Sequence, residues 1–192
     1  RQVLFAHSII SFAGIAIGFS LSMAIGVINT AAAVLLWLYS MYLKHKPLVG
    51  NVLVALLTGM TLVMVAVYYQ RNEQLLYNYA IFAFIITLVR EIIKDMEDMK
   101  GDRRFGSRTL PIIWGVRNTK RLLYMLVALF AGILFYSASM LGNTTLNHFL
   151  LILTIPVLYL VYLLYYADTQ LKFLRLSVYC KMIMLAGILS MV

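Results

Sequence analysis

The sequence predicts an all-α protein that lies in a membrane as a polytopic bundle of helices. Of its 192 residues, 63% are hydrophobic and only 12% are charged, a composition far too apolar for a water-soluble domain of this size. A helix that crosses a bilayer core of about 30 Å needs about 20 apolar residues, and runs of that length recur along the chain. The charged residues gather between these runs. Together these observations predict seven transmembrane helices in a single membrane domain, residues 1–192.

The predicted spans follow from the apolar runs in order. Residues 3–42 carry no charge if His7 is neutral, which leaves room for two spans with a tight turn between residues 18 and 26. The other five spans are expected at residues 49–69, 76–93, 122–141, 149–167 and from 176 onward. The longest segment between spans, residues 94–121, is expected to be a loop, with a short interfacial helix at residues 109–115 that ends at its glycine.

The basic residues predict the orientation of the bundle, because Lys and Arg accumulate on the cytoplasmic side of short loops. With seven spans, 14 of the 16 basic residues fall on one side, Arg71 alone falls on the other, and Lys181 lies within the seventh span. Residues 94–121 are therefore expected in the cytoplasm. The same bias explains the net charge of +9, so no nucleic-acid partner is expected, and no obligate protein partner is evident.

The acidic residues gather at one point of the chain. Five of the seven fall within the twelve positions from Glu91 to Asp102. If the preceding helix continues, Glu91, Asp95, Asp98 and Asp102 form one stripe, because side chains three and four residues apart share a face. Carboxylates suit Mg²⁺, which typically takes one or two of them and adds water and substrate phosphate. The stripe predicts a magnesium and phosphate site; the alternative is a solvated helix end whose acids are neutralised by neighbouring Lys and Arg.

A second polar cluster, residues 39–51, is predicted on the same side of the membrane. An ordinary positive-inside loop accounts for His45 and Lys46. Asn51 is different, because a carboxamide at the start of an apolar helix needs a partner. It could cap that helix or face the acidic stripe.

Taken together, these segments resemble the UbiA superfamily of intramembrane prenyltransferases. The resemblance rests on K-D-M-E-D-M-K-G-D at residues 94–102, on T-L-P at residues 109–111, and on residues 39–51, which are similar to the family's Y-x-x-x-x-K…G-N pattern. The R-E-I-I-K-D form at residues 90–95 is most similar to members of the digeranylgeranylglyceryl phosphate synthase type.

The resemblance implies an enzyme that transfers a prenyl group from a prenyl diphosphate to an acceptor, with Mg²⁺ as cofactor. In the most similar subgroup the acceptor is the hydroxyl of a glycerol-phosphate lipid, and the product is an ether. An aromatic acceptor of quinone or haem O biosynthesis is the alternative, and a cation-binding transporter is a more distant one. By resemblance, the metal and catalytic residues are Asp95, Asp98 and Asp102, and the diphosphate-binding residues are Lys44, Asn51, Lys94, Lys100 and Arg103.

The sequence departs from the family pattern in one respect. Members have nine transmembrane helices and two aspartate-rich motifs, and the first motif, of the type N-D-x-x-D-x-x-x-D, is absent from these 192 residues. The seven spans are therefore expected to correspond to the family's third to ninth helices, with the second motif in residues 94–121. The 192 residues alone are expected to be inactive.

Overall fold

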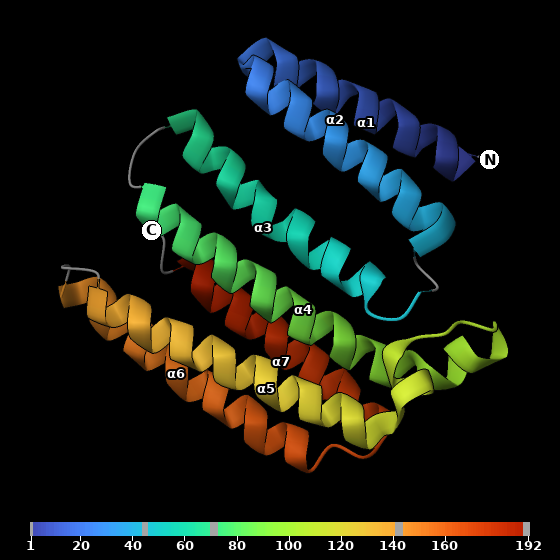
Figure 1. Cartoon of the computed structure of the whole chain (residues 1–192), viewed down its shortest axis with the longest axis vertical. Coiled ribbons are helices and arrows are strands. Elements are labelled where there is room, and N and C mark those ends of the chain that lie inside the picture. Colours follow the sequence, from blue (N-terminus) through green and yellow to red (C-terminus); the bar gives the residue numbers. More distant parts are fainter. Residues whose placement is uncertain (1, 44–45, 70–72, 141–143, 190–192) are drawn as a thin grey trace.

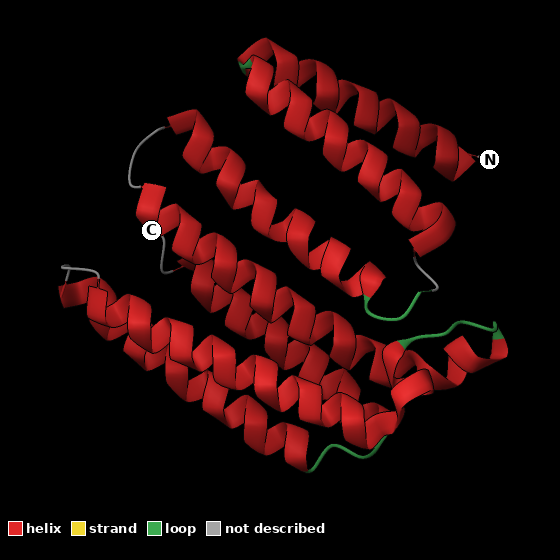
Figure 2. Cartoon of the chain, in the orientation of Figure 1, coloured by secondary structure: helices red, strands yellow, loops and turns green. Residues whose placement is uncertain are grey.

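A computed structural model describes residues 2–43, 46–69, 73–140 and 144–189, and these residues form helices joined by short connections (Figures 1 and 2). The all-α prediction is therefore confirmed for the described part of the chain. The elements are α1 (Gln2–Leu21), α2 (Met23–Leu38), the π-helical turn η1 (Tyr39–Leu43), α3 (Val49–Tyr69), α4 (Glu73–Arg104), α5 (Leu110–Met140), α6 (Thr144–Tyr165) and α7 (Gln170–Leu189).

The helices are apolar on their outer surfaces as well as in their contacts. Among the described residues, Met23–Leu43, Val49–Tyr69, Gln74–Arg104 and Leu110–Ser139 are long and apolar enough to cross a bilayer, and two shorter apolar helices are also present. Phe12, Ile10 and Leu171 are each at least 70% exposed. Such surfaces suit hydrocarbon rather than water, and they agree with an integral membrane protein.

The α4 helix lies at the centre of the arrangement. It packs against α3 on one side and against α5 and α7 on the other, while α6 packs against α5 and α7. The α1–α2 pair lies at the edge of the bundle farthest from α5 and α6. It contacts the rest of the bundle where α2 packs against α3 (Figure 1). A residue on α4 can therefore face either the α3 side or the α7 side of the bundle.

Two predicted boundaries agree closely with the structure, and one segment differs. The chain turns at Ser22, within the predicted turn, and α3 spans the predicted residues 49–69. Residues 94–121, predicted as a loop, are mostly helical, because α4 continues to Arg104 and α5 begins at Leu110. Most residues from 94 to 104 are charged, but the Lys, Glu, Met and Arg among them are good helix formers. The helix therefore continues beyond the end of its apolar run.

Gly115 interrupts α5 where the short interfacial helix was predicted to end. Its φ of 77° and ψ of 159° break the helical geometry, and a glycine adopts a positive φ without the steric cost that a side chain adds. Thr119 donates its hydroxyl to the Gly115 carbonyl at 2.9 Å. Residues 110–114 thus form a separate turn before the main part of α5.

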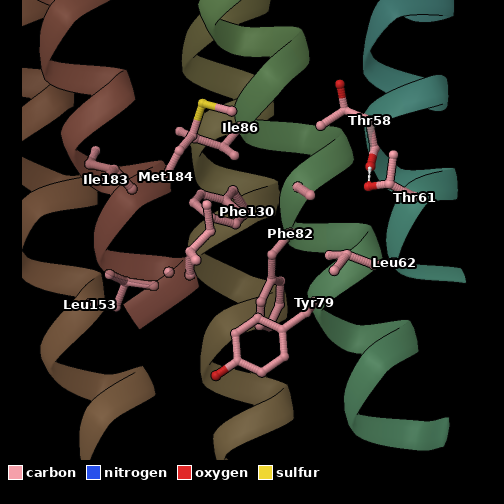
Figure 3. Close-up of a pocket in the computed structure, with 13 residues that line it drawn as sticks. Thr58, Thr61, Leu62, Tyr79, Phe82, Ile86, Phe130, Leu153, Ile183 and Met184 are labelled. Carbon is pink, nitrogen blue, oxygen red and sulfur yellow. Dashed lines mark hydrogen bonds between the residues drawn. The ribbon is translucent and has the colours of Figure 1, made fainter. Parts of the chain in front are cut away.

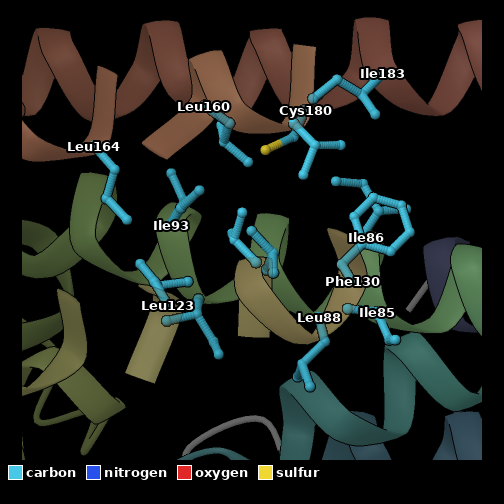
Figure 4. Close-up of a cluster of buried hydrophobic side chains, with 14 of the residues drawn as sticks. Ile85, Ile86, Leu88, Ile93, Leu123, Phe130, Leu160, Leu164, Cys180 and Ile183 are labelled. Atoms are coloured by element: carbon cyan, nitrogen blue, oxygen red, sulfur yellow. The ribbon is translucent and has the colours of Figure 1, made fainter. Parts of the chain in front are cut away.

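The core lies where α4, α5, α6 and α7 meet (Figure 4). Ile93 of α4, Leu123 of α5, Leu160 of α6 and Cys180 of α7 all have no exposed surface. Phe130 of α5 is 2% exposed and meets the Phe82 ring edge-on, at 5.9 Å between the ring centres. This packing fixes the face of α4 that points away from solvent.

Phe130→Ala is expected to lower the free energy of unfolding by about 3 kcal/mol, because it leaves a cavity among four helices. The loss should fall at the low end of the range for such truncations, since lipid is as apolar as the ring. Thermal unfolding in detergent measures it. Phe105→Ala is the matched control, because Phe105 is 86% exposed in the connection before α5. Equal stability of the two variants would contradict the packing described here.

A polar clamp ties α5 to the connection between α6 and α7. Lys120, whose side chain is 12% exposed, donates to the Tyr165 carbonyl at 3.3 Å and to Asp168 Oδ1 at 3.0 Å. The hydrogen bond and charge of Lys120 lower the pKa of the Asp168 carboxyl below its ordinary value. The clamp holds these two ends together at the same side of the bundle as the acidic stripe.

Candidate active site

The predicted acidic stripe is present on α4, because this helix runs unbroken from Glu73 to Arg104. Glu91, Asp95, Asp98 and Asp102 follow one another at steps of four, three and four residues and therefore share a face. Asp98 is exposed and the other three are half-buried. Asp95 lies within electrostatic range of the other three carboxylates, so the stripe is a local concentration of negative charge.

The structure brings Asn51 of α3 directly to this stripe. The Asn51 Nδ2 donates to Asp95 Oδ2 at 2.7 Å. The two residues are 44 positions apart in the sequence, so the contact depends on the packing of α3 against α4. Of the two roles left open for Asn51, facing the acidic stripe is the one that the structure shows.

The turn before α3 sets the position of Asn51. Leu48 has a φ of 62°, a conformation that costs a residue with a side chain about 1 kcal/mol or more. Its side chain packs against the core and holds this turn in place. Gly50 follows, and a Cβ there would lie 3.1 Å from the Tyr39 ring and 3.1 Å from the Leu43 carbonyl. The small residue lets η1 approach the first turn of α3 closely.

Tyr39 joins the same neighbourhood from η1. It lies within electrostatic range of Glu91 and Asp95, and π-helical turns such as η1 often occur at functional sites. Tyr39 begins the Y-x-x-x-x-K pattern of the sequence, but the sequence predicted no role for it. Three helical elements, η1, α3 and α4, thus converge at Asp95.

The predicted diphosphate-binding cations lie along the same end of α4. Lys94, Lys100 and Arg103 are all exposed, and they lie in the last three turns of α4. At about 100° per residue, Lys94 lies next to the acidic stripe around the helix, whereas Lys100 lies on the opposite face. Lys44 lies outside the described residues. The structure therefore leaves all three cations accessible at the end of α4 that carries the carboxylates, and a role in diphosphate binding stays a prediction.

The carboxylates only partly fit a magnesium site. Among the described residues, no three His, Cys, Asp or Glu side chains lie close enough together to hold a metal ion. Asn51 already engages one oxygen of Asp95. The stripe can thus supply one or two carboxylate ligands at a time, which is the number that Mg²⁺ usually takes when phosphate oxygens and water complete its shell. The donor chemistry fits a metal that arrives with a phosphate-bearing substrate.

Arg90 begins the R-E-I-I-K-D form and contributes to the count of basic residues, but the sequence predicted no role for it in the site. Its side chain is 20% exposed, and its Nη1 donates to the Glu91 carboxylate. Arg90 follows a long apolar run, and an ionisable residue at the end of such a run is a signal of function that charge counting overlooks.

In the complete protein, Asn51→Leu is expected to lower kcat/KM for the reaction that uses this site by about 10- to 100-fold, because Asp95 loses a hydrogen bond made to a charged group. The change is nearly isosteric, so the membrane-inserted protein should still fold. Asn118→Leu is the control, since Asn118 is exposed on α5 and donates only to the Trp114 carbonyl of its own helix. Unchanged kcat/KM in Asn51→Leu would exclude Asn51 from the site.

Comparison with known proteins places the chain among membrane synthases. A digeranylgeranylglyceryl phosphate synthase of Methanosphaera stadtmanae is 31% identical over 196 residues, which cover 99% of this chain and 70% of the relative. The synthase of the same name from Thermococcus sibiricus is 36% identical over 115 residues, 59% of this chain and 41% of the relative. That of Methanopyrus kandleri is 44% identical over 93 residues, 48% of this chain and 33% of the relative.

The fold matches a solved structure with a TM-score of 0.80 and 25% identity. It is described as "Structural and mechanistic insights into the biosynthesis of Digeranylgeranylglyceryl phosphate synthase in membranes", and the match covers 95% of this chain and 65% of that one. The chain thus spans about two thirds of the solved protein. The model of the UbiA prenyltransferase family matches residues 1–184. The acidic stripe, the Asn51–Asp95 contact and these matches lead to one conclusion: the chain belongs to the UbiA prenyltransferase family.

Proposed function

We propose that this chain carries part of the active site of a Mg²⁺-dependent prenyltransferase. The enzyme would transfer a prenyl group from a prenyl diphosphate to the hydroxyl of a glycerol-phosphate lipid and form an ether. The observation that supports this most is the hydrogen bond between Asn51 and Asp95, because it joins two segments that were each predicted to bind the diphosphate. The relatives of the synthase type support the choice of acceptor.

The proposed reaction changes three bonds. The bond between the prenyl C1 and the diphosphate oxygen breaks, and its electron pair leaves with the diphosphate. The acceptor's hydroxyl oxygen then bonds to C1, and its O–H bond breaks as the proton passes to the departing diphosphate. Bound Mg²⁺ would supply positive charge that stabilises the departing diphosphate.

Each site residue has a role in this scheme. Asn51 orients Asp95 through their hydrogen bond. Exposed Lys94, Lys100 and Arg103 would contact the diphosphate oxygens, and Lys44 is proposed for the same role. The apolar surfaces of the helices would exclude water from the allylic cation. The residues proposed to hold Mg²⁺ are Asp95, Asp98 and Asp102.

We further propose that all seven helices cross the membrane and that the acidic stripe faces the cytoplasm. The supporting observation is the distribution of Lys and Arg, of which 14 fall on the side of the stripe. In this arrangement the seven helices would correspond to the third to ninth of the family. Additional residues would then supply the first aspartate-rich motif.

Competition between acceptors tests this function. The protein with its complete sequence, including any residues that precede or follow these 192, is given geranylgeranyl diphosphate with equal amounts of a glycerol-phosphate ether lipid and a phenolic acceptor. The expected result is an ether product and Mg²⁺-dependent release of pyrophosphate. Prenylation of the phenol alone would establish the aromatic-acceptor alternative, and no pyrophosphate release with either acceptor would reject a prenyltransferase.

A further inference from the structure

A hollow lined by basic residues lies on the surface of the bundle, between α5 and the connection from α6 to α7. This basic hollow has a volume of about 480 Å³. Its α5 residues all lie between Val116 and Tyr124, spaced so that they share one face of the helix, just after the break at Gly115. The residues that line the basic hollow are Val116, Arg117, Lys120, Arg121, Tyr124 and Asp168.

The basic hollow differs in its lining from the cavity inside the bundle, between α3, α4 and α7 (Figure 3). That cavity has a volume of about 160 Å³, and its lining includes Tyr79, Phe82 and Ile86. The hydroxyls of Thr58 and Thr61 at its α3 side already donate to carbonyls of their own helix. Among the described residues, no charged side chain lines this cavity. The inner cavity therefore suits hydrocarbon, whereas the basic hollow suits an anion.

The positive charge of the basic hollow is only partly neutralised. Lys120 pairs with Asp168, the carboxylate of the lining, at 3.0 Å. Arg117 and Arg121 are exposed, and neither pairs with a carboxylate in the part of the chain that the structure describes. Arg121 donates to the amide oxygen of Asn118 at 3.4 Å. The hollow thus presents two guanidinium groups, about one turn apart, that have no acidic partner within the described ranges and attract an anion.

Exposed tyrosines place the basic hollow at the level of the membrane surface. Tyr162, Tyr165 and Tyr166 lie in and just after the last turn of α6, and each is more than half exposed. Tyrosine gathers where an apolar helix meets the lipid headgroups, because its ring is apolar and its hydroxyl is polar. Lys120 donates to the Tyr165 carbonyl at 3.3 Å, so the hollow lies at the level of these rings. Lipid headgroups are therefore within its reach.

The face of α5 that carries Arg121 continues as an exposed apolar surface. Met125 and Leu129 follow at successive steps of four residues, about 6 Å and about 12 Å along the helix, and they are 62% and 53% exposed. A phospholipid has the same order of parts, with a charged head followed by hydrocarbon chains. A free phosphate would use the cations alone and leave this apolar surface uncovered.

The basic hollow is separate from the acidic stripe. The α3 helix, which brings Asn51 to Asp95, and α5, which carries the hollow, lie on different sides of α4 (Figure 1). Within the described residues, α3 and α5 do not contact each other, and the lining of the hollow comes from α5 and the α6–α7 connection. An anion in the hollow would therefore be neither the donor diphosphate nor an acceptor held at the stripe.

We infer that the basic hollow binds the headgroup phosphate of an anionic membrane phospholipid. Arg117 and Arg121 are its phosphate ligands, and a hydrocarbon chain of the lipid lies along Met125 and Leu129. An arginine fork matches phosphate oxygens in a bidentate manner, and basic pockets at the ends of membrane helices bind anionic headgroups. The positive-inside bias accounts for basic residues on this side, but not for a hollow that two arginines share. The lipid is structural rather than a substrate, so the inference does not depend on the proposed function.

Thermal unfolding of the complete protein in detergent micelles tests this site, with phosphatidylglycerol as the anionic lipid at about ten times its Kd for the parent protein. The lipid should raise the Tm of the parent by about 4 °C, because a ligand that binds only the folded state stabilises it. Arg117→Gln combined with Arg121→Gln should weaken the affinity about 10-fold, since hydrogen bonds to a charged phosphate are lost. The shift in Tm should then fall to about 1 °C.

Arg104→Gln combined with Arg108→Gln is the charge-matched control. It also removes two exposed arginines, but these precede α5 and do not line the basic hollow. This variant should keep the shift of about 4 °C. Phosphatidylcholine has a phosphate but no net charge, and inorganic phosphate has no hydrocarbon chain. Each should raise the parent Tm by less than about 1 °C at the same concentration.

The other outcomes overturn the inference. An unchanged shift in the Arg117 and Arg121 glutamine variant excludes these arginines as ligands, and an equal loss in the control variant shows that overall charge, rather than the hollow, attracts the lipid. A full shift with phosphatidylcholine contradicts selection of an anionic head, and a full shift with inorganic phosphate contradicts a lipid ligand. Should the glutamine variant not fold, Arg117→Lys combined with Arg121→Lys replaces it. That variant keeps the charge but lacks the fork, so an unchanged shift contradicts bidentate recognition.

Discussion

Asp98→Ala in the complete protein is expected to lower the turnover of prenyl transfer by about 10²- to 10³-fold, the usual effect of removing one group that stabilises developing charge. Asp98 is exposed near the C-terminal end of α4. Its loss should therefore change stability little, because surface substitutions commonly stay within about 0.5 kcal/mol. Single-turnover rates with radiolabelled prenyl diphosphate measure the effect, and thermal unfolding shows that the variant is folded.

Asp102→Ala should behave similarly, because Asp102 follows one turn later on the same stripe. Glu97→Gln is the matched control. Glu97 lies between Asp95 and Asp98 in sequence but off the stripe, so the change removes a negative charge from the same helical turn without touching the proposed ligands. Near-normal transfer by both aspartate variants would disprove the metal site. An equal loss in Glu97→Gln would show that overall charge, rather than the stripe, matters.

The helices could be predicted from the sequence because bilayer thickness dictates the length of an apolar run. The bounds of α3 are the clearest case, since charged residues flank both ends of its span. The end of α4 could not be predicted in this way. Hydropathy marks where a helix leaves the apolar layer, whereas helix propensity decides where the helix ends, and residues 94–104 are polar but mostly favour helix.

The candidate site was predictable in part for a similar reason. Helical spacing alone places Asp95, Asp98 and Asp102 on one stripe, and α4 confirms the helix that this spacing requires. The partner of Asn51 depends on how α3 packs against α4, which no local pattern encodes. The pairing of Arg90 with Glu91 depends likewise on side-chain conformations that no sequence pattern gives.

Chelation of divalent metal with EDTA is expected to abolish prenyl transfer, and added Mg²⁺ should restore it. The structure also predicts that the affinity for Mg²⁺ depends on the bound diphosphate. Because the described residues gather no three metal-ligating side chains, Mg²⁺ should bind weakly until the diphosphate supplies further oxygen ligands. By reciprocity of binding, prenyl diphosphate should then lower the concentration of Mg²⁺ needed for half-maximal binding.

Thermal unfolding distinguishes joint binding from a preformed metal site. Mg²⁺ alone should barely raise the Tm, whereas Mg²⁺ with a non-hydrolysable prenyl diphosphate analogue should raise it by about 4 °C or more, since a ligand that binds only the folded state stabilises it. The analogue in EDTA is the control and should have a smaller effect. If Mg²⁺ alone raised the Tm as much as the pair does, the carboxylates would form a complete site by themselves. The stripe supplies only one or two ligands at a time, so joint binding is the expected result.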